Sequence, residues 1–401
     1  MKHSMKFAAA VLTTLFAATV PALAQKQTPG VTDTEIKIGQ TFAYSGPAGA
    51  FSSIAKTDAA FFKYINDQGG IHGRKINFIS LDDGYSPPKG LELTRQLVEQ
   101  ENVAFIYGSL GTAVNKATQK YLNQKKVPQI LIASPAPDFA DPKNFPWTMG
   151  WQSNTETEAA IFGKYILANK PGAKIGVMYQ NDDYGRGMLA GLKRGLGEKN
   201  AAMIVSAVSY ETTDATIDSQ ITTLRAAGAD VFVNASIPKF AAQAIRIASD
   251  SGWKPMHFLG SVSNSIGLTL KPAGLDKSAG LISAQFYKDP TDPRWASDPA
   301  LEAWRAWAKK YYPEADLSDA NNVYGYARAN TLVQILKQCG GDFSRENIMK
   351  QAASLKDFEA PGLLPGIRLN TSATDFHPVR QMQMLQFDGT RWQLSGNVIS
   401  D

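Results

Sequence analysis

Strand-like and helix-like segments alternate regularly from Glu35 onward, and this alternation limits the fold more than any other feature of the chain. Short runs rich in Ile, Val and Phe, such as residues 35–44 and 75–83, are each followed by an amphipathic segment of helical length. This βαβα order predicts parallel strands covered by helices on both faces. We therefore expect an α/β protein with doubly wound sheets.

The alternation falls into two blocks. It stops at a Pro- and aromatic-rich stretch, residues 141–152, and a second series of strands and helices then runs to about residue 262. A helical block follows at residues 298–355, and two strand-like runs near the end are separated by Asp388-Gly389, which is typical of a β-hairpin. We expect two βα domains, with the chain returning to the first and then crossing again.

Residues 1–24 are typical of a secretory signal peptide. Lys2 and Lys6 form a basic start, an apolar run follows, and Ala22-Leu23-Ala24 matches an A-x-A cleavage site. The run is short for a membrane span and ends at Pro21. Cleavage after about Ala24 leaves 401 − 24 = 377 residues, a length that suggests two domains outside the cytoplasmic membrane.

Composition excludes several classes of function. The formal charge of +5 falls to about +3 without Lys2 and Lys6 and is scattered, which argues against nucleic-acid binding. The four histidines are far apart and lack metal-ligand spacing, and no nucleophile elbow, HExxH or P-loop motif is present. The single cysteine, Cys339, ends an apolar helical run, where a structural thiol is expected. We expect no enzyme, no cofactor and no metal.

One motif imitates a dinucleotide site. Residues 185–190 read G-x-G-x-x-A after a strand. Four residues, 181–184, separate that strand from the glycines, so the glycines do not form the tight turn that a pyrophosphate needs. Close packing between helices is the better interpretation.

Residues after the strand ends are the candidate ligand contacts, because ligands of open α/β sheets bind beyond the carboxyl ends of the strands. Gly111-Thr112 stands at a predicted helix start, where backbone N–H groups, a hydroxyl and the helix dipole suit an anion. Alternatively, Thr112 only caps its own helix. The residues alone leave both interpretations open.

Several segments of the chain also follow the pattern of one protein family. They are IKIGQTFAYSGP, INDQGGIHGRKINFISLDDGYSPPKG, IYGSLGT, YQNDDYGRG and SAGLISAQFYKDP, of which GGIHGRKI followed by LDDGYSP is the most specific. With these segments the chain resembles the periplasmic substrate-binding proteins of ABC importers in the leucine/isoleucine/valine-binding (type I periplasmic binding protein) family. The resemblance covers the whole mature chain.

The resemblance implies a type I periplasmic-binding fold, with two doubly wound lobes joined by three hinge crossovers near residues 147–150, 281–285 and 361–366. The N-terminal lobe would comprise residues 25–147 and 282–362, and the C-terminal lobe residues 148–281 and 363–401. The lobes would close on a ligand without catalysis. A monomer in the periplasm, whose partners are a small-molecule carboxylate and an ABC membrane permease, is expected.

The resemblance also implies the site. Thr112, helped by the loop at 134–136, would hold a ligand carboxylate, and Phe51 and Tyr184 would supply aromatic walls. Where amino-acid binders place a carboxylate for the ligand ammonium, this chain offers Val262. The complete set of expected ligand-binding residues is Phe51, Leu110, Gly111, Thr112, Ser134, Pro135, Ala136, Tyr184, Ile237, Val262 and Ser263.

The absence of a carboxylate at Val262 favours an aromatic or otherwise apolar organic acid as the ligand, because an ammonium buried without a counter-charge would cost several kcal/mol. Branched 2-keto acids are close competitors. If Asp183 supplied the missing charge, a branched-chain or other amino acid would fit instead. A ligand-sensing protein shares the same fold, and an enzyme on this scaffold is the least favoured alternative.

Overall fold

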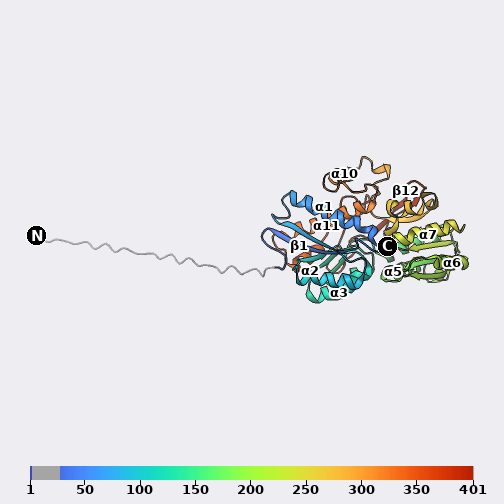
Figure 1. Cartoon of the computed structure of the whole chain (residues 1–401), viewed down its shortest axis with the longest axis horizontal. Coiled ribbons are helices and arrows are strands. Elements are labelled where there is room, and N and C mark those ends of the chain that lie inside the picture. The colour runs from blue at the N-terminus through green and yellow to red at the C-terminus, as the bar shows by residue number, and fades with distance from the viewer. Residues whose placement is uncertain (2–27, 401) are drawn as a thin grey trace.

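A computed structural model describes residue 1 and residues 28–400, and its elements form two α/β lobes (Figure 1). The predicted signal peptide lies outside the described residues except for Met1. Within the described part of the chain, no helix has both the length and the apolar character needed to cross a bilayer.

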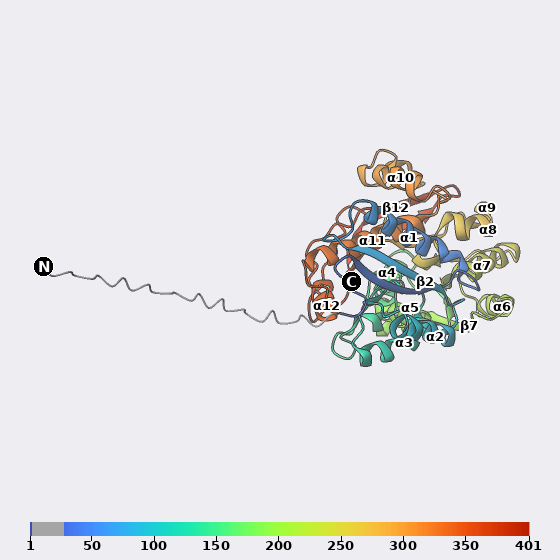
Figure 2. The same cartoon turned by 60° about the vertical axis from the view of Figure 1, so that its left-hand side comes forward.

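The first lobe contains a parallel sheet of five strands in the order β2-β1-β3-β4-β5. Its strands are β1 (Glu35–Phe42), β2 (Lys75–Asp82), β3 (Phe105–Tyr107), β4 (Gln129–Ile132) and β5 (Thr148–Gly150). Its helices are α1 (Ser52–Asp67), α2 (Pro87–Glu99), α3 (Thr112–Lys125), α10 (Pro299–Tyr311), α11 (Ala320–Gln338) and α12 (Arg345–Ala352). Helices α1 and α11 lie side by side although they are far apart in the sequence (Figure 2).

The second lobe contains a mixed sheet in the order β12-β11-β10-β9-β8-β6-β7. Its parallel strands are β6 (Ile175–Gln180), β7 (Ile204–Tyr210), β8 (Val231–Ala235), β9 (Met256–Leu259) and β10 (Ile282–Gln285). The predicted C-terminal hairpin is confirmed, since β11 (Gln381–Phe387) and β12 (Trp392–Ser400) pair antiparallel. The helices are α4 (Thr155–Asn169), α5 (Asp183–Leu196), α6 (Asp218–Ala226), α7 (Pro238–Asp250), α8 (Lys271–Ala273) and α9 (Leu275–Ser278).

Two strands at the crossovers lie on the other side of the boundaries drawn from sequence. The sequence divided the chain just before residues 148 and 282. Strand β5 nevertheless pairs with β4 in the first sheet, and β10 pairs with β9 and β11 in the second. The pairing therefore favours crossovers after Gly150 and after Gln285, because each strand completes the sheet that the chain is about to leave.

A buried ion pair fixes α11 to the first sheet. The Arg328 guanidinium donates to the Asp58 carboxylate on α1 and to the Gly108 carbonyl, the latter at 2.9 Å. Gln40 and Tyr107 also donate to Asp58, and both charged side chains are fully buried. Gly108 has φ +59°, and a Cβ there would lie 2.8 Å from the guanidinium carbon, so the close approach of Arg328 requires glycine.

One glycine of the dinucleotide-like motif, Gly187, and the following Gly191 pack helices together, whereas a Cβ at Gly185 would lie 2.0 Å from the Gln180 carbonyl oxygen of β6. A Cβ at Gly187 would lie 2.3 Å from the Thr155 hydroxyl oxygen, and one at Gly191 would lie 2.4 Å from the Glu156 carbonyl oxygen. The backbones of α4 and α5 therefore touch along the glycine face of α5. Cys339 is a buried free thiol at the C-terminal end of α11, which agrees with the structural role expected from sequence.

Candidate ligand-binding cleft

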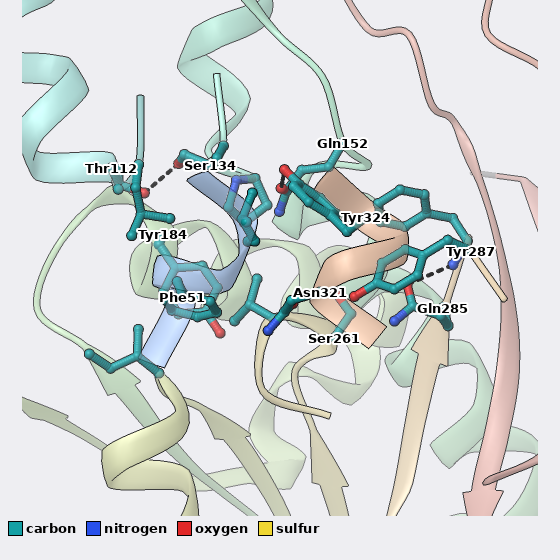
Figure 3. A pocket seen from close by; sticks show the side chains of 18 of the residues that line it. Phe51, Thr112, Ser134, Gln152, Tyr184, Ser261, Gln285, Tyr287, Asn321 and Tyr324 are labelled. Carbon is teal, nitrogen blue, oxygen red and sulfur yellow. Dashed lines mark hydrogen bonds between the residues drawn. The ribbon is translucent and has the colours of Figure 1, made fainter. Parts of the chain in front are cut away.

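A cavity lies between the lobes (Figure 3). The first lobe contributes loops after its strands and the start of α11. The second lobe contributes the start of α5 and the turns after β8 and β9, and the first two crossovers supply further side chains.

The carboxyl end of β3 builds the polar end of the cavity. Gly111 is the N-cap of α3 with φ +94°, and a Cβ there would lie 2.4 Å from the Tyr85 ring, so only glycine allows this contact. Thr112 is the first residue of α3, and its hydroxyl lies 2.6 Å from that of Ser134 (Figure 3). No side chain caps α3, so the threonine hydroxyl is not a helix cap. The first N–H groups of the helix lie beside these hydroxyls, an arrangement that suits an anion.

Nine of the eleven predicted residues line the cavity. They are Phe51, Leu110, Gly111, Thr112, Ser134, Pro135, Tyr184, Ile237 and Val262.

The two other predicted residues, Ala136 and Ser263, do not line it. Ala136 packs in a small cluster with Ile132 and Phe139, and its N–H donates to the Ser134 hydroxyl at 3.3 Å. The Ser263 hydroxyl donates to the Ser236 carbonyl and is turned to the backbone.

The sequence reasoning missed the contacts that come from the crossovers and from α11. Gln152 follows β5, and Gln285, Phe286 and Tyr287 lie at or after the end of β10. Their closeness to the predicted crossovers was an available signal. Asn321 and Tyr324 lie in the first turns of α11 and carried no such signal. The remaining unpredicted lining residues are Ile54, Tyr85, Ala133 and Ser261.

Aromatic side chains form much of the cavity wall. Phe51 and Tyr184 are 6% and 4% exposed, so both residues are buried. Near the crossovers, the rings of Tyr287 and Tyr324 meet edge to face with centroids 5.7 Å apart. Such surfaces suit an apolar or aromatic ligand body.

None of the residues that line this cavity is Asp, Glu, Lys, Arg or His. Glu158 on α4 stands behind Ser261, whose N–H and hydroxyl donate to its two oxygens at 2.6 and 2.8 Å. Burial raises the pKa of Glu158 to about 7. Asp183, the alternative partner for an ammonium, does not line the cavity and pairs with Arg186 at 2.8 Å. The cavity therefore holds no counter-charge for an ammonium group.

Most polar side chains around the cavity have partners. Tyr324 donates its hydroxyl proton to Gln152, and Gln285 donates to Asn264 at 3.2 Å. Two polar atoms have neither a partner nor solvent contact: the Tyr184 hydroxyl and the side-chain nitrogen of Asn321. Asn321 is directed from α11 into the space between the lobes (Figure 3).

Two α/β lobes with a largely apolar cavity between them, lined by no charged side chain, are the architecture of a bilobal binding protein. The chain belongs to the periplasmic binding protein family, whose model matches residues 35–391. The type I periplasmic-binding fold and the family resemblance predicted from sequence are both confirmed.

The relatives agree over nearly the whole chain. The chain is 25% identical over 389 residues to Leu/Ile/Val-binding protein homolog 7 of Brucella abortus (strain 2308), covering 94% of each chain. It resembles a branched chain amino acid ABC transporter from Thermus thermophilus with bound valine, with TM-score 0.83, 16% identity and coverage of 92% of this chain and 98% of that chain. A fatty acid ABC transporter substrate-binding protein from Thermomonospora curvata matches with TM-score 0.79, 21% identity and coverage of 94% and 95%.

Proposed function

We propose that the protein is exported to the periplasm, captures a small carboxylate between its lobes and delivers it to the membrane permease of an ABC importer. Two of the solved relatives are named as ABC transport proteins, which supports this role. The proposal that the ligand is a carboxylate rests on the start of α3. There Thr112, Ser134 and free helical N–H groups meet at the cavity.

We propose further that the ligand is an aromatic or apolar organic acid. The cavity joins the polar start of α3 to aromatic and aliphatic surface from both lobes, including Phe51, Ile237 and Val262. An amino acid would place its ammonium in a cavity without any charged side chain, at a cost of several kcal/mol. A branched-chain amino acid is the competing ligand, because the sequence relatives are named Leu/Ile/Val-binding protein homologs. The relative named as a fatty acid transport protein supports an acid without an amino group.

The proposed function needs no chemical step, because capture and release depend only on closure of the lobes. Closure brings together walls that belong to different lobes, such as Thr112 and Ile237. The permease then recognises the closed form. A ligand recovered unchanged after prolonged incubation agrees with this role, and its conversion to a product would refute it.

The decisive experiment is a thermal-shift screen on protein that has been unfolded and refolded to remove any ligand carried from purification. 3-Phenylpropionate is compared with its amide, 3-phenylpropionamide, and with its amino counterpart, phenylalanine. The keto acid 4-methyl-2-oxopentanoate is compared with its amino counterpart, leucine. We expect an acid to raise Tm with concentration while its partners do not. Tight binding of leucine, isoleucine, valine or phenylalanine, with none of the deaminated partner, would overturn the ligand class. Equal affinity for the acid and its amide would refute the assignment of a carboxylate site.

A further inference from the structure

The two unpartnered polar atoms of the cavity come from opposite lobes. Tyr184 lies in the first turn of α5 in the second lobe, and Asn321 lies in the first turn of α11 in the first lobe. Their side chains are 4% and 5% exposed, and each buries a hydrogen-bonding atom without a partner. A buried polar group without a partner is destabilising, so such groups are rare unless something binds them.

Neither side chain is explained by the local structure. Helix α11 is capped by Asp319, whose carboxylate accepts the backbone N–H of Asn321 at 3.0 Å, so the asparagine amide is not needed for capping. The Tyr184 ring lines the cavity, which a phenylalanine ring would do equally well. A Cβ at Gly260 would lie 2.9 Å from the Tyr184 hydroxyl oxygen, so the glycine keeps the space beside this hydroxyl free of a side chain.

The chemistry of the two groups limits what they can bind. The Asn321 nitrogen donates protons only, whereas the Tyr184 hydroxyl donates one proton and also accepts. Burial raises the pKa of Tyr184 well above its ordinary value, so the hydroxyl stays protonated. An oxygen atom satisfies both groups. That oxygen is neutral, because no cationic side chain lines the cavity to balance a second negative charge.

We propose that Asn321 and Tyr184 together receive a neutral hydroxyl or carbonyl oxygen on the body of the ligand, in addition to the carboxylate held at Thr112. The ligand class is thereby narrowed to hydroxy or keto acids with an apolar or aromatic body. This inference rests on the proposed function, since it needs an acid in the cavity. It also links the lobes through the ligand, because the two residues belong to different lobes.

The test is calorimetry with two matched pairs of acids. The pairs are 3-phenylpropionate with 3-(4-hydroxyphenyl)propionate, and 4-methylpentanoate with 4-methyl-2-oxopentanoate. We expect wild-type protein to bind the oxygenated member of at least one pair about tenfold more tightly or better, as for a gained pair of hydrogen bonds. Tyr184→Phe and Asn321→Ala should each bring this ratio close to one, because each removes one of the two groups that receive the added oxygen.

Matched controls remove the same chemical groups outside the cavity. Tyr179→Phe removes a hydroxyl from β6, and Asn330→Ala removes an amide from α11 that donates to the Tyr326 carbonyl. Both controls should keep the wild-type ratio. Plain acids that bind as tightly as their oxygenated partners in both pairs would overturn this inference and leave the proposed function standing. Binding of none of the four acids would overturn both.

Discussion

Replacing Thr112 by valine removes the hydroxyl at the start of α3 and keeps the volume of the side chain nearly unchanged. The hydroxyl lies 2.6 Å from that of Ser134 and the side chain is 2% exposed, so the change is confined to the polar end of the cavity. Hydrogen bonds to a charged partner contribute about 1.5–3 kcal/mol. If Thr112 donates to a ligand carboxylate, Thr112→Val should raise the Kd of the acid by about 10- to 150-fold.

The fold should tolerate this change. The hydroxyl does not cap α3, and Ser134 keeps the N–H of Ala136 as a donor at 3.3 Å. The loss of one buried hydroxyl pair should lower the free energy of unfolding by about 1 kcal/mol. Urea unfolding measures this loss, and calorimetry with the acid and its amide measures binding.

Thr118→Val is the matched control on the same helix. Its buried hydroxyl donates to the Asn115 carbonyl at 3.0 Å and does not line the cavity, so binding should remain at the wild-type level. The difference between acid and amide should shrink in Thr112→Val and persist in Thr118→Val. A Thr112→Val protein that folds and binds the acid as tightly as wild type would refute the assignment of the carboxylate.

Three further predictions concern closure and stability. A bound acid should reduce the radius of gyration in small-angle scattering of the refolded protein, and an unchanged radius at saturation would contradict closure of the lobes. Arg328→Met should lower the free energy of unfolding by about 3–5 kcal/mol because Asp58 loses its buried partner, and adding Asp58→Asn should restore part of it; an additive double loss would contradict the ion pair. Burial raises the pKa of Glu158 from 4.5 to about 7, so the folded state holds its proton more tightly and stability should fall as pH rises through this range. The free energy of unfolding of wild type should fall by up to about 3 kcal/mol more than that of Glu158→Gln between pH 5 and pH 8. If urea unfolding gave the same pH dependence for both proteins, this prediction would be refuted.

Much of the fold was predictable because local patterns specify it. The second series of strands and helices expected after residue 152 is observed, and it includes α4 at Thr155–Asn169 and α7 at Pro238–Asp250. Both begin with a clear signal, an Asn N-cap before Thr155 and a proline at the first position in the second case. Strand β5 was not predicted, since its three residues lie within a Pro- and aromatic-rich stretch and take their form from pairing with β4.

The candidate site was predictable where a single strand end builds it. Gly111 and Thr112 follow β3 after the short connection 108–110, and the rule for strand ends indicated them. Asn321 and Tyr324 were not predictable, because they reach the cavity only through the packing of α11 against α1, more than two hundred and fifty residues earlier in the chain. Ser263 was misplaced because a hydrogen bond to the Ser236 carbonyl, which no periodicity reveals, turns its side chain to the backbone.

The neutrality of the cavity has a consequence for how ligand capture depends on the surrounding solution. Long-range attraction of a charged solute depends on a local field from charged side chains, and salt weakens that field over about 10 Å at 0.1 M ionic strength. The lining of this cavity supplies no charged side chain, and positive potential at close range comes only from helix starts such as that of α3. Salt should therefore change the affinity for a bound acid only a little, because the lining offers no charged side chain whose ion pair with the ligand could be screened.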